Sequence, residues 1–329
     1  MPNHMPEPTI AEALNAAHHQ LMADDESVIC FGEDFAQNGG VFGVSNGLLE
    51  AFGPARVFDT PISETAFIGM AVGAAITGLK PIVELMFCDF AGVCFDQILN
   101  QAAKARFLSN GNLKMPLVIR TTMGAGDGSG AMHSQSLHGL LASIPGLVVV
   151  APSSPADAAG LLKSAVMSDD PVIFMENKTL YGHTGPVEAS LPPVPIGEAR
   201  TLKSGNDITI VAASAMTQAA LAAAETLEHK GVSASVIDPR TIKPVDWNTI
   251  QSSVQQTGRL LVIDEGAAFG GFADTVIAGM TDRVFSALKA APKKLTPPDT
   301  PVPYAVGAEG TWMPGASDIV NVATQLMEA

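Results

Sequence analysis

Cysteine and aromatic residues are scarce in this 329-residue chain. Its three cysteines, Cys30, Cys88 and Cys94, have spacings that match no zinc site. Their odd number does not suggest a disulfide framework, so we expect a reducing, cytoplasmic compartment. Aromatic residues make up only 5% of the chain, whereas glycine and alanine are abundant. This composition is typical of close packing between helices and a sheet.

Positive charge is also scarce. The chain has 18 Lys and Arg against 33 Asp and Glu, which gives a net charge of −15, and no dense basic run. We therefore expect no nucleic-acid partner and no attraction to an anionic membrane. No apolar run reaches the roughly 18 residues that a membrane span needs. The first eight residues lack the basic and apolar regions of a signal peptide, so we expect none.

Short apolar runs alternate with longer helical patterns in the first half of the chain. The runs are rich in Val, Ile and Leu and do not alternate with polar residues, as in strands buried on both faces of a parallel sheet. Five strands are predicted, at 27–32, 81–85, 116–121, 147–151 and 172–175. Four helices are predicted between them, at 10–23, 63–78, 88–108 and 155–168. This order indicates an α/β fold.

A proline-rich stretch at 185–197 interrupts the pattern, and the alternation then restarts. The second half predicts strands at 207–213, 232–238 and 259–264, and helices at 216–230, 246–257, 269–287 and 316–327. We therefore expect two α/β domains, at residues 1–190 and 191–329.

A glycine-rich run, Gly124 to Gly130, follows one predicted strand. Such loops can present backbone N–H groups to a phosphate, but no Gly-Lys-Ser/Thr follows, which excludes a P-loop NTPase. Gly126-Asp127-Gly128 resembles the opening of the magnesium-diphosphate motif of thiamin diphosphate enzymes. No Asn closes that motif 25–30 residues later. We interpret the run as a turn after a strand.

Glu64 and His133 are the candidate acid–base residues. Glu64 follows Pro61 and Ser63 at the start of a predicted helix, where it suits either a capping carboxylate or a carboxyl group active in proton transfer. His133 lies just beyond the glycine run, with His138 five residues later. A histidine near the carboxyl end of a strand suits acid–base chemistry, although an exposed or capping histidine fits the pattern equally well.

Six segments, in order and at matching spacing, resemble the beta subunit of 2-oxoacid dehydrogenase decarboxylase components. They are Asp59-Thr-Pro-Ile-Ser-Glu64, Gly69-Met-Ala-Val-Gly-Ala-Ala75, Glu84-Leu-Met-Phe-Cys-Asp-Phe90, Phe95-Asp-Gln-Ile98, His133-Ser-Gln135 and Pro145-Gly-Leu-Val-Val-Val150. The family includes the pyruvate, branched-chain 2-oxoacid and acetoin dehydrogenases. The stretch from Glu84 to Ala105 and the segment Ala151 to Pro155 most resemble the acetoin dehydrogenase beta subunit.

The resemblance implies a transketolase-like fold with two doubly wound domains, a pyrimidine-binding domain and a transketolase C-terminal domain. It implies thiamin diphosphate as cofactor, with the diphosphate and magnesium held by an alpha subunit. It therefore implies an α2β2 heterotetramer, in which this chain alone is inactive. In relatives the second domain also docks the subunit-binding module of a lipoyl acyltransferase.

The same resemblance assigns the site residues. Glu64 corresponds to the family glutamate that hydrogen-bonds the pyrimidine ring of the cofactor, and Ile62 and Phe90 to residues beside that ring. His133 corresponds to the active-site histidine that contacts the substrate or the lipoyl group. Five further positions match a monovalent cation site, here potassium, in some members: Leu117, Ala165, Val166, Ser168 and Asp170.

The chain departs from the family at Asp127, Met132, Leu140 and Leu141, around the active-site loop, which leaves the substrate open. The expected reaction is oxidative cleavage of acetoin, and the alternative is decarboxylation of pyruvate or a branched-chain 2-oxoacid, with transfer of the acyl group to a lipoyl group. The Gly-x-Gly-x-x-Gly fingerprint of a nicotinamide dehydrogenase is absent from this sequence, which disfavours that class of enzyme. A non-catalytic scaffold is disfavoured because Glu64 and His133 are present.

Overall fold

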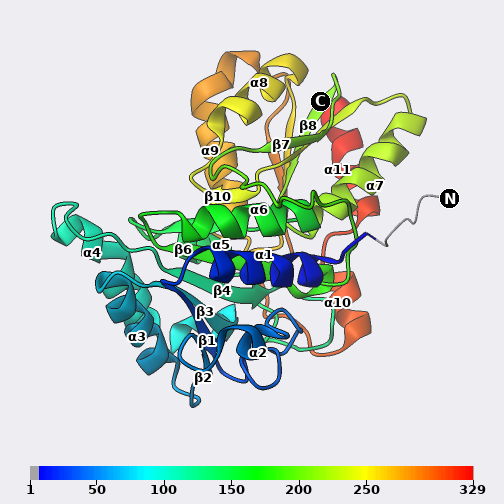
Figure 1. Cartoon of the computed structure of the whole chain (residues 1–329). Coiled ribbons are helices and arrows are strands. Elements are labelled where there is room, and N and C mark those ends of the chain that lie inside the picture. Colours follow the sequence, from blue (N-terminus) through cyan, green and yellow to red (C-terminus); the bar gives the residue numbers. More distant parts are fainter. Residues whose placement is uncertain (1–6, 329) are drawn as a thin grey trace. The chain divides into compact units, whose positions relative to one another are not determined.

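The structure is a computed structural model that describes residues 7–328, and the chain divides into two compact units. The first unit comprises residues 1–122 and 144–196, and the second comprises residues 123–143 and 197–329. Each unit is an α/β assembly with its own sheet and helices (Figure 1). The segment 123–143, which carries His133, groups with the second unit although it lies early in the sequence.

Parallel strands form the sheet of the first unit, where they run in the order β5-β6-β4-β3-β1-β2. Their bounds are β1 Val28–Gly32, β2 Val57–Asp59, β3 Lys80–Phe87, β4 Val118–Met123, β5 Val148–Val150 and β6 Val172–Asn177. Strands β1, β4 and β6 are buried along their whole length, as the continuous apolar runs predicted.

Helices pack on this sheet and are fixed at their ends by local sequence. Their bounds are α1 Ile10–Asp24, α2 Leu48–Phe52, α3 Glu64–Ile76, α4 Ala103–Leu108 and α6 Pro155–Val166. Helix α1 begins with a capping box between Thr9 and Glu12, and α6 begins with Ser154 as N-cap and Pro155 in its first turn. Helices α1 and α6 lie side by side (Figure 1).

The second unit has a mixed sheet in the order β12-β11-β8-β9-β7, in which β7 runs antiparallel to β9. The strands of this sheet are β7 Arg200–Lys203, β8 Ile208–Ala212, β9 Ala234–Asp238, β11 Leu260–Ile263 and β12 Lys293–Leu295, and the short strand β10 Thr241–Lys243 is not part of it. The helices of this unit are α5 His138–Ala142, α7 Met216–His229, α8 Trp247–Thr257, α9 Phe272–Val284, α10 Val306–Trp312 and α11 Ala316–Glu328. Helix α7 packs with α11, and α8 packs with α9.

The predicted 88–108 helix is not continuous, and this prediction was wrong. The segment instead comprises a 3₁₀ turn at Cys88–Gly92, a π-helix at Gln97–Ala102 and then α4. The Thr65 hydroxyl donates a hydrogen bond to the Val93 carbonyl at 2.7 Å, which ties this irregular stretch to α3. Interruptions of this kind re-aim side chains and often occur at functional sites.

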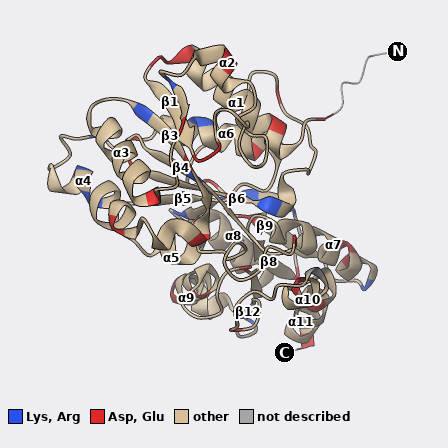
Figure 2. Ribbon diagram, turned by 90° about the horizontal axis from the view of Figure 1, so that it is seen from below, with Lys and Arg blue, Asp and Glu red and all other residues tan. Residues whose placement is uncertain are grey.

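Lys and Arg residues are scattered among the elements rather than gathered along one of them (Figure 2). No helix within residues 7–328 is long and apolar enough to cross a membrane.

Candidate functional site

The carboxyl ends of β1 and β2 place two glutamates together. In the parallel pair Gly32 lies opposite Asp59, so the chain leaves both strands at the same edge. Glu33 follows β1, and Glu64 begins α3 four residues after Thr60. The Ser63 N–H donates to Glu33 Oε1 at 3.3 Å. Ligands of open parallel sheets gather at such edges.

Asp59, the first residue of the motif Asp59-Thr-Pro-Ile-Ser-Glu64, holds the loop after Glu33. Its carboxylate accepts hydrogen bonds from the backbone N–H of Ala36 at 2.6 Å and of Gln37 at 3.3 Å. Through Asp59, the motif that follows β2 therefore holds the loop that follows β1 at the same edge of the sheet.

Glu64 is buried, with 9% of its surface exposed, at the N-terminus of α3. Its carboxylate accepts no hydrogen bond from any described residue, and the Ser63 hydroxyl turns away to donate to the Pro61 carbonyl at 3.0 Å. Its oxygens are not among the fully enclosed polar atoms that lack a partner, so they remain reachable by solvent or a ligand. The geometry therefore favours a group that binds a partner over a helix cap.

Glu33 was missed by the sequence analysis. Burial first, and then the nearby charge of Glu64, raise the pKa of Glu33 above its ordinary value. Its place directly after a buried parallel strand was the signal that could have found it. A carboxyl group whose pKa is raised by burial and by a neighbouring carboxylate is typical of sites that handle protons.

We expect Glu33→Gln to stabilise the chain more at pH 7.5 than at pH 4.5. The raised pKa means that the folded wild-type chain loses stability as pH rises from the ordinary glutamate value through the folded one, since ionisation of the buried group is penalised. Gln cannot ionise and escapes this loss. Thermal unfolding of both chains at the two pH values measures it, with the exposed Glu50→Gln as control. A difference in Tm that does not grow with pH contradicts the assignment.

Ile62 and Phe90 provide apolar surface in the same unit. Ile62 lies two residues before Glu64 and is 85% exposed, which is unusual for isoleucine. Phe90 lies in the 3₁₀ turn after β3 and makes an edge contact with Phe87, their ring centroids being 5.6 Å apart. An aromatic row continues from Phe87 through Phe42 to Tyr181.

A buried ion-pair network underlies this unit. Arg120 on β4 donates from Nε and Nη2 to Glu176 on β6, both at 2.7 Å, and from Nη1 to Glu84 on β3 at 2.8 Å. The Tyr181 hydroxyl donates to Glu176 at 2.6 Å. Although burial opposes it, the two carboxylates raise the pKa of Arg120 above its ordinary value. The network joins three adjacent strands.

His133 lies in the second unit, half-buried, on a loop closed by backbone hydrogen bonds. Gly124 N–H donates to the Gln135 carbonyl at 3.3 Å, and His133 N–H to the Gly130 carbonyl at 3.3 Å. The glycine run is a loop after β4, as predicted. Its N–H groups are not open to a phosphate, because Gly126 and Gly128 donate to Glu309 at 3.0 and 2.7 Å.

His138 is buried instead of accessible. Its Nε2 lies 2.7 Å from Asp264 Oδ1, and Asp264 also accepts from the backbone N–H groups of Gly266 and Ala273. Burial opposes protonation, but the Asp264 carboxylate prevails and raises the pKa of His138. This pair anchors α5 to the end of β11 and leaves His138 no direct role with a ligand.

The five predicted cation-site residues lie together in the first unit. Leu117 precedes β4 and its carbonyl accepts from Val172 N–H at 2.9 Å, while Ala165 and Val166 end α6. Ser168 and Asp170 lie in the following turn, and Asp170 pairs with Arg106 at 2.8 Å. Carbonyls at a helix C-terminus suit a cation. Among described residues no group of three His, Cys, Asp or Glu side chains can hold a metal, so any cation here depends on carbonyls.

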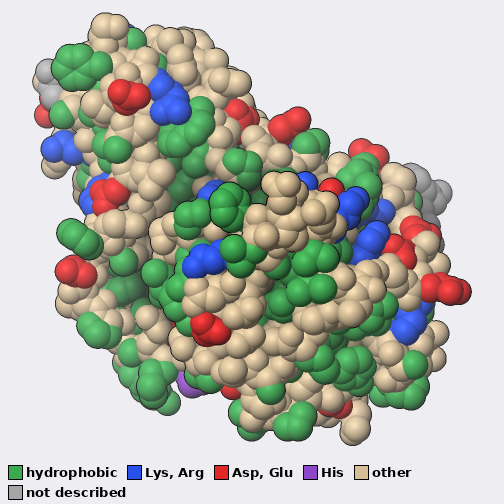
Figure 3. Space-filling model, turned by 90° about the vertical axis from the view of Figure 1, so that its left-hand side faces the viewer, with side chains coloured by type: hydrophobic (Ala, Val, Ile, Leu, Met, Phe, Trp, Pro, Cys, Tyr) green, Lys and Arg blue, Asp and Glu red, His purple; other side chains and the backbone are tan. Residues whose placement is uncertain are grey.

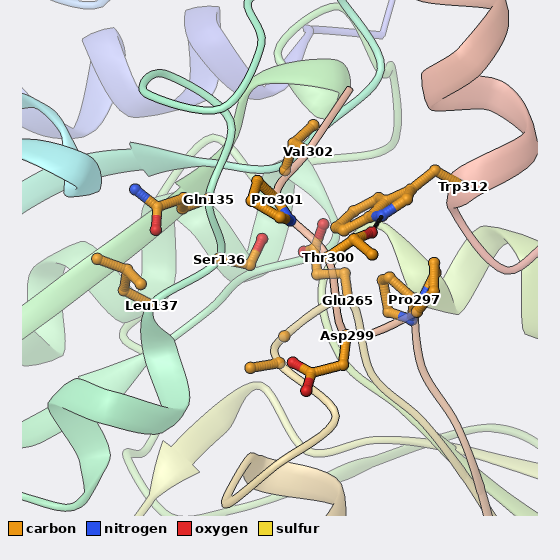
Figure 4. A pocket seen from close by; sticks show the side chains of 13 residues that line it. Gln135, Ser136, Leu137, Glu265, Pro297, Asp299, Thr300, Pro301, Val302 and Trp312 are labelled. Atoms are coloured by element: carbon orange, nitrogen blue, oxygen red, sulfur yellow. Dashed lines mark hydrogen bonds between the residues drawn. The ribbon is translucent and has the colours of Figure 1, made fainter. Parts of the chain in front are cut away.

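One cavity of about 120 Å³ lies within the second unit (Figure 4). Gln135, Ser136 and Leu137 line one side, and the 297–302 segment with Trp312 lines the other. It contains none of the predicted site residues, although Gln135 lies two residues beyond His133.

The chain matches the pyrimidine-binding domain of transketolase over residues 6–184 and the transketolase C-terminal domain over residues 197–319. It is 43% identical over 331 residues to the beta subunit of acetoin:2,6-dichlorophenolindophenol oxidoreductase of Bacillus subtilis, with 97% of both chains covered. The chain belongs to this transketolase-like family of beta subunits. The predicted family and fold are thereby confirmed.

Other members of the family are equally similar. The same acetoin oxidoreductase subunit of Cupriavidus necator is 44% identical, with 97% of both chains covered. The pyruvate dehydrogenase E1 component subunit beta of Rickettsia bellii is 43% identical, covering 97% of this chain and 98% of its own. An inactive beta4 tetramer of a split-gene transketolase has the same fold, with a TM-score of 0.80 at 23% identity, over 98% of this chain and 99% of that one.

Proposed function

We propose that this chain is the beta subunit of a thiamin diphosphate-dependent oxidoreductase that cleaves acetoin oxidatively. The acyl group is then passed to a lipoyl acyltransferase. The similarity to two acetoin oxidoreductase beta subunits supports this substrate. The pyruvate dehydrogenase subunits, at nearly the same identity, support pyruvate as the second candidate, with a branched-chain 2-oxoacid as a further alternative.

The observation that carries the proposal is the unbonded carboxylate of Glu64. Its residue is 9% exposed and lies two positions after the exposed Ile62, at the carboxyl ends of parallel strands, and Phe90 lies in the turn after β3, which is the neighbour of β1 in the sheet. One hydrogen-bonding acid with apolar neighbours fits an aminopyrimidine ring. When bound, thiamin diphosphate supplies a carbon nucleophile and an electron sink for the substrate carbonyl.

Each residue then has a distinct task. Glu64 would hydrogen-bond a ring nitrogen of the pyrimidine and control where its proton resides, while Ile62 and Phe90 would supply apolar surface for the ring and exclude water. His133 contacts the substrate or the lipoyl group, and it donates a proton or stabilises developing negative charge there. Glu33, whose pKa is raised by burial and by the charge of Glu64, is the neighbouring carboxyl group.

The diphosphate end of the cofactor does not fit this chain. The glycine-rich loop has two of its N–H groups occupied by Glu309, and no described cluster of three side chains suits magnesium. We therefore assign the diphosphate and magnesium to an alpha subunit in an α2β2 heterotetramer. Large apolar side chains exposed on α3 and α4 support a partner surface: Met70, Ile76, Phe107 and Leu108. On the face seen in Figure 3, hydrophobic side chains are scattered among polar and charged ones.

For the two domains we retain the division at residues 1–190 and 191–329. The second domain is proposed to dock the subunit-binding module of the acyltransferase. The acidic balance of the chain, −15, suits a basic module. Deletion of the last helix, α11, should weaken binding of that module, measured by calorimetry. Unchanged affinity contradicts this docking surface.

The turn at Ser168 to Asp170 is proposed to hold potassium. We expect Tm to be higher in potassium chloride than in choline chloride of equal ionic strength, because a cation that binds only the folded chain stabilises it by mass action. Asp170→Asn should leave most of this difference in place, because the proposed ligands are backbone carbonyls and the Asp170 carboxylate is already paired with Arg106, and Asn100→Ala on the π-helix should also keep it. The same Tm in both salts for the wild-type chain contradicts the site.

Substrate choice is tested by co-expressing this chain with an alpha-type partner. Thiamin-dependent dye reduction is then measured with acetoin and with pyruvate on one preparation. Activity with acetoin alone supports the first proposal. Activity with pyruvate alone agrees with the family but contradicts acetoin as the substrate. Inactivity with both, in a stable complex, points to another 2-oxoacid or to a scaffold role.

A further inference from the structure

The loop that carries His133 is held by a buried acid from the far end of the sequence. Glu309 lies on α10, is fully buried, and is more than 170 residues from the loop. Its Oε2 accepts from both Gly126 N–H and Gly128 N–H, at 3.0 and 2.7 Å. Hydrogen bonds to an ionised acceptor are stronger than neutral ones, so a single carboxylate oxygen fixes two points of the loop.

The glycines make this contact geometrically available. Gly126 and Gly128 have φ values of +133° and +79°, which residues with a Cβ adopt at a cost. Alternating backbone conformations of this kind turn successive N–H groups to one side and form a concave anion site. Glu309 fills this site from within the chain. The glycine run therefore does bind an acidic group, but that group is the side chain of Glu309 rather than a phosphate.

Residues before and after Glu309 make further contacts in the same unit. The Trp312 indole N–H donates to the Thr300 hydroxyl at 3.0 Å, and both residues line the cavity opposite Gln135 (Figure 4). Before α10, the Tyr304 ring lies against Gly130 so closely that a Cβ on this glycine would meet Tyr304 Cδ2 at 2.5 Å. Beyond His133, the loop ends at the buried His138–Asp264 pair.

We propose that Glu309 is a positioning residue that sets where His133 lies, so that the C-terminal part of the chain takes part in the reaction through this loop. The proposal rests on the proposed function, in which His133 acts on substrate or the lipoyl group. Oε1 of Glu309 has no hydrogen-bond partner among described residues, so Oε2 alone carries the contact to the loop. Replacing the Glu309 carboxylate therefore weakens both of its hydrogen bonds to the loop.

The first test needs only the full-length chain. In Glu309→Gln, hydrogen exchange of the Gly126 and Gly128 amides should be about tenfold faster or more, because the charged acceptor is lost. Glu309→Asp, which keeps the charge but is one methylene shorter, should exchange at an intermediate rate. Glu225→Gln, exposed on α7 in the same unit, serves as matched control. Unchanged exchange in Glu309→Gln overturns the proposal.

The second test is a double-mutant cycle in the complex with the alpha subunit, using whichever of acetoin or pyruvate is turned over. Glu309→Gln should lower kcat about 10- to 100-fold, since small misplacements of a reacting group have effects of this size. In a His133→Ala background the same substitution should lower kcat less than about twofold, because the residue it positions is gone. An equal loss in both backgrounds shows a merely structural role and overturns the proposal.

The cycle separates this inference from the proposed function. If His133→Ala alone leaves kcat unchanged, the role of His133 fails, and with it the catalytic half of the inference. The exchange rates then still decide whether Glu309 holds the loop. If Glu309→Gln does not fold, Glu309→Asp carries both measurements.

Discussion

Glu64→Gln in the assembled enzyme should lower kcat about 10²- to 10⁴-fold, the range that a positioned acid–base group contributes. Gln can still accept a hydrogen bond, but it cannot share a proton with the pyrimidine ring. Binding of thiamin diphosphate, measured separately by calorimetry, should weaken far less than kcat falls. Turnover at saturating cofactor is the measurement that decides.

The matched control for this change is Glu26→Gln, an exposed glutamate in the same unit, which should retain full turnover. If Glu64→Gln also retains it, the buried carboxylate is a structural group and the assignment of the pyrimidine site is wrong. If only cofactor affinity is lost, Glu64 binds the ring without directing its proton.

Arg120→Met should be the most destabilising single change in the first unit, at about 3–5 kcal/mol. It leaves the buried carboxylates of Glu84 and Glu176 without the cation that compensates them, 2.8 and 2.7 Å away. Denaturant titration of the chain measures the loss, read from the first unfolding transition because two units need not unfold together.

Two further variants show how much of the stability lost in Arg120→Met comes from the uncompensated buried charges. Lys80→Met breaks a half-exposed pair with Asp25 and should cost about 1 kcal/mol or less. A triple variant, Arg120→Met with Glu84→Gln and Glu176→Gln, removes the charges together and should recover part of the stability. If Arg120→Met unfolds at the wild-type denaturant concentration, the network does not stabilise the sheet.

Sequence periodicity predicted the elements that are long and uniformly apolar. Strands β1, β4 and β6 and helices α1, α6 and α7 emerge close to their predicted bounds, because burial on both strand faces and the capping residues leave clear patterns. Short elements such as β2 and α2 were missed, since three to five residues carry no readable period. The 88–108 segment was misjudged because its interruptions depend on contacts with α3.

The family resemblance assigned Glu64, Ile62, Phe90 and His133 to the site, and these assignments stay predictions. The sequence could not show which of their contacts are satisfied. Arg120 and Glu84 are polar residues inside apolar strands, and only strand pairing reveals their partners. Glu309 had no local signal at all, because its partners lie more than 170 residues away.

The most direct test of the account compares three preparations: this chain alone, an alpha-type partner alone, and the two co-expressed. Each is assayed for dye reduction with and without thiamin diphosphate and magnesium. The account predicts activity only when both chains and the cofactor are present, because we propose that this chain holds the pyrimidine end of the cofactor and an alpha subunit holds the diphosphate end. Activity of this chain alone, or activity of the complex that does not depend on the cofactor, would contradict it.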